Sequence, residues 1–191
     1  DAIKEHNTHA AEDDPLEVAH APNDDNAEQH NGHLEPKQFR ENGLQLGFTI
    51  EEMAVRVEGV LKGIGLIREF APVVYLIAHG SSSANNPHHG AHDCGACSGR
   101  PGSVNARVFA WMANHSGVRS LLKERGLYIP DETQFVGCLH DTAADAIEYY
   151  DLTILTTANA ARHKQNADNF EHALNYNARE RSRRFESIDT K

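Results

Sequence analysis

The stretch that decides the fold is FAPVVYLIAHG, residues 70–80. Its apolar run, Val73–Ala78, is short and bounded by Pro and Gly, which predicts a buried strand. Upstream, apolar residues between Ile50 and Ile64 recur at the spacing of one helix face, and Thr49 and Glu52 form a capping box before them. A fully apolar strand preceded by a helix predicts a partly parallel sheet covered on both faces, and therefore an α/β fold flanked by helices.

The segments after this strand continue the α/β pattern. We expect helices over Ser103–Asn114, with Ser103 as the cap, and over Val118–Arg125, then a strand over Thr133–Leu139 and a long polar helix over 158–185. In open α/β sheets, ligands gather at the carboxyl ends of the strands. The loop 79–102 and the sequence HDT at 140–142 lie at such ends, so both are candidate functional segments.

The first forty residues differ from the rest in composition. They hold ten acidic and three basic side chains, and five of the thirteen histidines, within a chain of net charge −10. They have almost no large apolar side chains, so they cannot bury enough surface to offset their ordering entropy. We predict an acidic, His-rich flexible tail or insertion over 1–40 and an α/β domain over 41–191, which is part of a larger domain.

Charge, hydropathy and cysteine number exclude several classes of protein. Outside the acidic segment the chain lacks the basic face that a nucleic-acid surface needs. The longest apolar run, Val73–Ala78, is far shorter than the roughly 20 residues that span a bilayer. Three cysteines, an odd number, do not suggest a secreted disulfide framework and favour a reducing cytoplasm. Because the chain starts at Asp1 without Met, we expect it to be a piece of a longer protein or a trimmed form of one.

The loop AHGSSSANNPHHGAHDCGACSGRPG, residues 78–102, holds the side chains best suited to chemistry. His79 lies at the strand end and Cys94 follows fifteen residues later. Imidazole and thiolate are the ligands that zinc prefers, so this pair is a candidate metal site. Zinc wants three or four protein ligands, and the others could come from Asp93, Cys97, His88, His89 or His92.

Other chemistries are open at the same loop. Cys94 and Cys97 form a C-x-x-C, as in dithiol oxidoreductases, although Cys94 lies sixteen residues beyond the predicted strand. The sequence HGSSS is similar to some oxyanion loops, but the chain has no G-x-S-x-G elbow. Gly99, Arg100 and Gly102 before a helix could hold an anion, or simply form a tight turn. A glycine-rich loop with incidental histidines is the remaining alternative.

Three features outside the loop also bear on a site. Cys138 lies in the second predicted strand and is expected to be a buried structural thiol. His140 and Asp141 are more suggestive, because a carboxylate can orient a histidine. The basic residues near the end of the long helix are expected to be solvated, where cations suit the helix dipole; they are Arg179, Arg181, Arg183 and Arg184.

Long motifs then resemble a known family. HGSSSANNPHHGAHDCGACSG, with NARV, IPDETQF and HDTAAD, is similar to the large DabA-type subunit of bacterial inorganic-carbon transporters, and the resemblance runs from about Leu46 to Phe185. It implies a core like that of β-type carbonic anhydrases, with Zn²⁺ held by two cysteines, a histidine and an aspartate. By this resemblance His79 and Cys94 are two of the four zinc ligands.

The chain departs from the family pattern in one important respect. The other two ligands belong to a Cys-x-Asp motif, followed by an arginine that pairs with the aspartate in catalysis, and this chain has no Cys-x-Asp. We expect the catalytic Asp/Arg pair upstream and the isolated chain to be inactive. Smaller departures are Gly90 and His92, where the resemblance predicts Ser and Leu, and Ser98, where it predicts Gly.

The resemblance implies zinc-dependent hydration of CO2 to bicarbonate in an energy-coupled uptake complex. It also implies an ion-translocating membrane partner of the DabB type, and a cytoplasmic location on the inner face of the cell membrane through that partner. Two alternatives stay open. One is a non-enzymatic α/β binding module with an incomplete metal site, and the other is a dithiol oxidoreductase using Cys94 and Cys97.

Overall fold

The computed structural model describes residues 40–41, 44–45, 47–82, 93–185 and 187. Residues 38–191 form one compact unit, and its α/β class confirms the prediction. The tail or insertion predicted over 1–40 lies outside the described residues, apart from Arg40 in strand β1 (Arg40–Glu41), which pairs with β2 (Leu44–Gln45).

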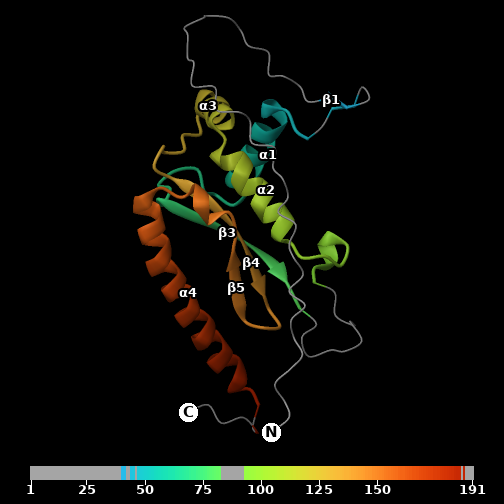
Figure 1. The fold of residues 1–191 in the computed structure, drawn as a ribbon, viewed down its shortest axis with the longest axis vertical. Coiled ribbons are helices and arrows are strands. Elements are labelled where there is room, and N and C mark those ends of the chain that lie inside the picture. Colours follow the sequence, from blue (N-terminus) through green and yellow to red (C-terminus); the bar gives the residue numbers. More distant parts are fainter. Residues whose placement is uncertain (1–39, 42–43, 46, 83–92, 186, 188–191) are drawn as a thin grey trace, which may run out of the picture. The chain divides into compact units, whose positions relative to one another are not determined.

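A second sheet of three strands, in the order β3-β4-β5, forms the centre of the unit (Figure 1). β3 (Val73–Gly80) and β4 (Gln134–Asp141) are parallel and pair without interruption from Val73↔Gln134 to Gly80↔Asp141. β5 (Ala146–Tyr149), which the sequence did not predict, is antiparallel to β4. Both predicted strands are longer at their carboxyl ends than expected, so His79 and His140 lie within strands, paired with each other.

The four α-helices of the described residues match the predicted ones, apart from their ends. They are α1 (Ile50–Gly63), α2 (Ser103–Asn114), α3 (Ser116–Glu124) and α4 (Thr157–Ser182), with 3₁₀ turns at Gly95–Cys97 and Leu152–Ile154. The capping box is confirmed: the Thr49 N–H donates to Glu52 Oε2 at 2.8 Å, and the Glu52 N–H to Thr49 Oγ1 at 3.2 Å.

Two helix starts differ from the expected ones. Gly102, not Ser103, occupies the N-cap of α2. α3 begins two residues earlier than predicted, because the Nδ1 of His115 accepts a hydrogen bond from the N–H of Gly117 at 3.1 Å and caps the helix. An imidazole acceptor replaces the usual hydroxyl or carboxylate cap there.

The sheet lies between helices, as a parallel pair requires. α2 covers one face of β3 and β4, and α4 lies against the other (Figure 1). The larger core forms where α1, α2 and α3 meet the sheet, around Leu61, Leu122 and Phe135. α2 approaches β4 very closely at Gly137, where a Cβ would lie 2.8 Å from the Cα of Arg107.

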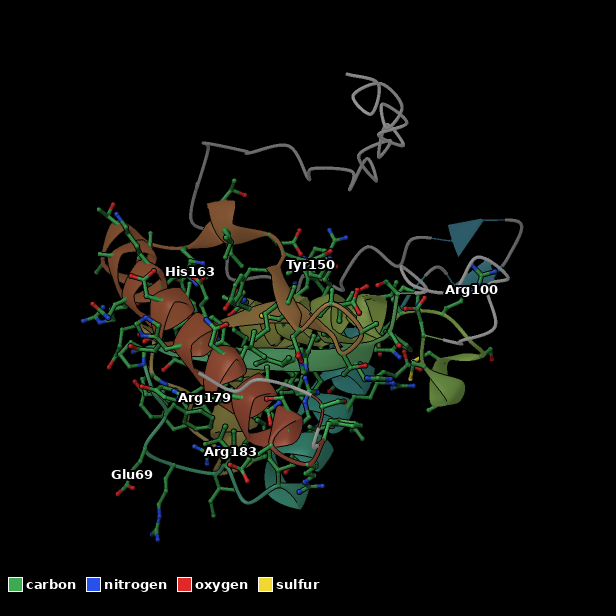
Figure 2. The ribbon with its side chains drawn as sticks, turned by 90° about the horizontal axis from the view of Figure 1, so that it is seen from below. Glu69, Arg100, Tyr150, His163, Arg179 and Arg183 are labelled. Carbon is green, nitrogen blue, oxygen red and sulfur yellow. The ribbon has the colours of Figure 1, made fainter. Side chains whose placement is uncertain are left out.

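α4 binds its face of the sheet through aromatic rings. The Tyr75 hydroxyl lies 3.0 Å from Nδ1 of His163, and the rings of Tyr75 and Phe170 meet edge to face at 5.2 Å. His163 and Arg179 mark the two halves of this helix in Figure 2. Burial lowers the pKa of His163, which favours the neutral imidazole on the side of α4 that faces the sheet.

Candidate functional site at the carboxyl edge of the sheet

The carboxyl ends of β3 and β4 meet at one edge of the sheet, because the two strands are parallel. His79 and His140 are partners in the register there, so their side chains leave the same face. Side chains two residues apart in a strand lie on the same face, so Tyr75 shares the face of His79 and Cys138 shares that of His140. Tyr75 contacts His163 of α4, so this is the face that α4 covers. His79 is exposed and His140 is half-buried.

The segment 93–102 returns to this edge and is attached to it at both ends. The N–H of Ser81 donates to Oδ1 of Asp93 at 2.9 Å, and the N–H of Gly102 donates to the carbonyl of His79 at 2.9 Å. A Cβ at Gly102 would lie 3.0 Å from that carbonyl oxygen, so only glycine fits without displacement. Cys94 follows Asp93 directly, which brings it back to the end of the strand that contains His79.

Cys94 and Cys97 are half-buried free thiols at the two ends of one 3₁₀ turn. The N–H of Cys97 donates to the carbonyl of Cys94 at 3.0 Å. A hydrogen bond from the Cys97 thiol lowers the pKa of Cys94, and the same pairing raises the pKa of Cys97. The thiolate form, which binds metals and acts as a nucleophile, is therefore favoured at Cys94.

Asp141, at the end of β4, fixes the backbone of the two loops that leave the sheet. Its Oδ1 accepts hydrogen bonds from the N–H groups of Ser82 at 3.0 Å, Ala143 at 2.9 Å and Ala144 at 3.2 Å. Burial alone would raise the pKa of this carboxyl, but these hydrogen bonds outweigh it and lower the pKa to about 2. Asp141 is thus a structural anion rather than a proton carrier near neutral pH.

The carboxylate beside His140 is Asp145, not Asp141 as the sequence suggested. His140 Nε2 lies 3.8 Å from Oδ1 of Asp145, and both atoms are buried without a hydrogen-bond partner in the described structure. Asp145 also pairs with Arg181 of α4, so Arg181 is not simply a solvated helix end as predicted. Asp145 was missed because only its left-handed backbone, with φ of 51°, turns it back toward the strand.

The described loop does not support the anion interpretation, and HGSSS, on which the hydrolase interpretation rests, lies partly outside the described residues. The N–H groups of Gly99 and Gly102 are already used by the carbonyls of Cys94 and His79, so they are not free for an anion. The tight turn, which was the other interpretation, is the one found. Cys138 is fully buried as expected, and burial raises its pKa to about 12.

The donors fit zinc in kind but not in number. Within the described parts of the chain, no group of three or more His, Cys, Asp or Glu side chains is placed to hold a metal. His79 and Cys94 offer an imidazole and a thiolate, half of a tetrahedral zinc set. His88, His89 and His92, the other histidines considered from the sequence, lie outside the described residues.

Comparisons with known proteins agree on one family. A family profile described as "Probable inorganic carbon transporter subunit DabA" matches residues 2–191. A protein of that name from Azotobacter vinelandii is 57% identical over 151 residues, which is 79% of this chain and 18% of the relative. Another from Nitrosospira multiformis is 57% identical over 155 residues, 80% of this chain and 17% of the relative.

A more distant relative, "Probable inorganic carbon transporter subunit DabA 2" from Rhodopirellula baltica, is 42% identical over 142 residues. The chain spans less than a fifth of the length of these relatives. No solved structure matches the chain. Among the described helices, none combines the length and the apolar character needed to cross a membrane.

Proposed function

The chain belongs to the family of probable inorganic carbon transporter subunits DabA, and from this we propose that it forms half of a zinc site for CO2 hydration in a larger subunit. His79 supplies an imidazole and Cys94 a thiolate. The remaining ligands, and the catalytic Asp/Arg pair, come from a Cys-x-Asp segment elsewhere in the full-length protein. The chemistry that zinc would supply there is a water molecule with its pKa lowered toward neutrality, which CO2 hydration needs.

One observation supports this proposal above the others. Hydrogen bonds from Ser81 to Asp93, and from Gly102 to His79, hold the Cys94 segment at the end of the His79 strand. Cys94 is also the cysteine whose pKa is lowered, so deprotonation for metal binding costs less there than at an ordinary thiol. Asp141 supports the arrangement by fixing the backbone at Ser82.

Elemental analysis of the full-length protein tests the assignment. We expect His79→Ala and Cys94→Ser to lose most of the bound zinc and, with it, CO2 hydration. Two neighbours provide matched controls: Cys97→Ser removes the other thiol of the turn, and His140→Gln removes the histidine paired with His79. Both controls should keep wild-type zinc, and unchanged stoichiometry in both ligand variants would reject the proposal.

The hydrogen bond between the Cys94 and Cys97 thiols favours dithiol oxidoreduction as the second candidate. That chemistry needs both sulfurs, whereas the zinc proposal needs only Cys94. A disulfide-reduction assay on Cys97→Ser separates them: a full loss of reduction with zinc retained supports the dithiol, and undiminished reduction excludes it. A non-enzymatic module predicts neither zinc nor turnover in the full-length protein.

We also propose that the full subunit works at the cytoplasmic face of the cell membrane through an ion-translocating partner of the DabB type. The names of the relatives support transport as the context. Cell fractionation with and without the partner gene is the direct measurement. We expect membrane association only when the partner is present, and association that is independent of it would contradict this arrangement.

A further inference from the structure

β3 lies at the edge of its sheet, yet its composition is that of a central strand. All eight of its residues pair with β4 without a bulge, and none of the described strands pairs with its other side. The carbonyls of Pro72 and Gly80 accept from β4 and the residue after it. Because the backbone alternates, the N–H and C=O groups of Val73, Tyr75 and Ile77 point to the open side.

Natural proteins protect open edges with charged side chains, prolines, bulges or very short strands. β3, with the sequence VVYLIAHG, has none of these features. Its side chains are mostly apolar on both faces, as in a parallel strand with neighbours on each side, and Ile77 is left 41% exposed. The opposite edge strand, β5, has only four residues, includes Glu148 and looks like an ordinary edge.

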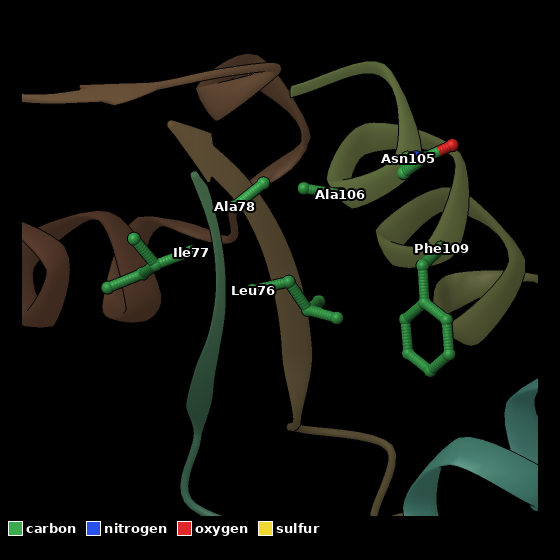
Figure 3. Close-up of a pocket in the computed structure, with 6 residues that line it drawn as sticks. All are labelled: Leu76, Ile77, Ala78, Asn105, Ala106 and Phe109. Atoms are coloured by element: carbon green, nitrogen blue, oxygen red, sulfur yellow. The ribbon is translucent and has the colours of Figure 1, made fainter. Parts of the chain in front are cut away.

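A groove runs beside this open edge. It has a volume of about 300 Å³ and lies between β3 and α2 (Figure 3), and its lining residues are Leu76, Ile77, Ala78, Asn105, Ala106 and Phe109. In Figure 3, Leu76 and Ala78 project toward α2 while Ile77 projects to the other face. An added strand would therefore find apolar side chains to pack against on both faces.

The length of the open stretch is also defined. At its carboxyl end, the carbonyl of His79 is already taken by the N–H of Gly102 at 2.9 Å. Among the described residues, nothing pairs with this side of Val73–Ile77, a stretch of about 16 Å at the usual rise of a strand. This is the length of a typical strand in a globular protein.

We infer that β3 is an interior strand of a larger sheet, and that a parallel strand from the same polypeptide, outside residues 1–191, pairs with it along Val73–Ile77. The relatives are more than five times longer than the matched part, so a full-length protein of this family has enough further chain to supply a strand. A strand of the same polypeptide is also present at high effective concentration. A second copy related by a two-fold axis would pair antiparallel, which suits less well a strand that is apolar on both faces. The inference does not depend on zinc.

Two measurements on the full-length protein test this pairing. In hydrogen–deuterium exchange, the amides of Val73, Tyr75 and Ile77 should exchange at least about 100-fold more slowly than in an unstructured peptide. A photoreactive amino acid in place of Asn105, which lines the groove, should form a cross-link to the same polypeptide outside this region. The matched control replaces Val104, which is 64% exposed on the same helix but does not line the groove.

The expected result is slow exchange at all three amides, with a cross-link from position 105 that is absent from position 104. Four outcomes would overturn the inference. They are fast exchange of the three amides, a cross-link to a second copy or another protein, a cross-link only within residues 1–191, and no excess of cross-linking over the control.

Discussion

Replacing Asp141 tests how the sheet edge is held together. One carboxylate oxygen accepts three backbone N–H groups, from Ser82, Ala143 and Ala144, at 2.9–3.2 Å. It thereby joins the loop after β3 to the turn between β4 and β5. Asp141→Asn keeps an oxygen acceptor but removes the charge, whereas Asp141→Ala removes both, so the pair separates the two contributions.

The magnitude follows from the pKa of Asp141. Burial acts to raise it, but the hydrogen bonds lower it from the ordinary 3.8 to about 2. At about 1.4 kcal/mol per pKa unit this corresponds to about 2 kcal/mol, which solvent screening of a half-buried group reduces to about 1 kcal/mol. Because the folded-state pKa is depressed, this stability is fully present above pH 4 and is lost as pH falls through about 2.

Urea denaturation followed by circular dichroism between pH 2 and 7 measures the effect. The wild type should lose unfolding free energy between pH 4 and 2, with about 1 kcal/mol of that loss due to Asp141, so Asp141→Asn should lose about 1 kcal/mol less over the same range. Asp141→Ala should cost a further 1–2 kcal/mol at pH 7, because N–H groups lose their acceptor. Asp168→Asn, an exposed residue of α4, controls for the loss of one charge. If the unfolding free energy of Asp141→Asn falls between pH 4 and 2 as steeply as that of the wild type, the reasoning is refuted.

Three further substitutions test backbone and packing features by the same denaturation assay. Ser98→Gly should raise the free energy of unfolding by about 0.5–1 kcal/mol, because Ser98 has φ of 57°, where glycine is unstrained. A lower free energy of unfolding in this variant would contradict the prediction. Gly137→Ala should destabilise by about 1–3 kcal/mol, since its Cβ would meet the Arg107 backbone at 2.8 Å, while Gly59→Ala, in open space on α1, should not destabilise. Asn159→Ala should cost about 1–3 kcal/mol, because the Glu132 carbonyl loses its donor and the Pro72 carbonyl keeps only the one from Gln134. A cost below about 1 kcal/mol would show that water replaces the amide.

The elements that the sequence predicted well are those whose own pattern determines them. α1 was predicted from its capping box and apolar face, and β3 from its unbroken apolar run. β5 was not predicted, because its four residues alternate between exposed and half-buried and contain no apolar run. It exists through pairing with β4, an interaction between segments that a local pattern does not contain.

The candidate site shows the same division. His79 was placed correctly at the sheet edge, although β3 continues through it because pairing with β4 extends to Gly80↔Asp141. The return of the Cys94 segment depends on hydrogen bonds to Ser81 and His79, which no spacing rule reveals. Asp145 was missed for a similar reason, since a left-handed turn brings it within 3.8 Å of His140.

Two incomplete features meet in the same strand, which argues for a common cause. Among the described residues β3 has no partner on one side along Val73–Ile77, and at its carboxyl end lie His79 and Cys94, which we propose as half of a zinc ligand set. A strand added parallel to β3 would end beside His79, where it could deliver further ligands, whereas an antiparallel strand would only begin there. The two proposals can still fail separately. If the β3 amides exchange slowly but His79→Ala keeps its zinc, the added strand is supported and the metal binds elsewhere. If His79→Ala loses zinc but the β3 amides exchange fast, His79 is supported as a ligand and the added strand is rejected.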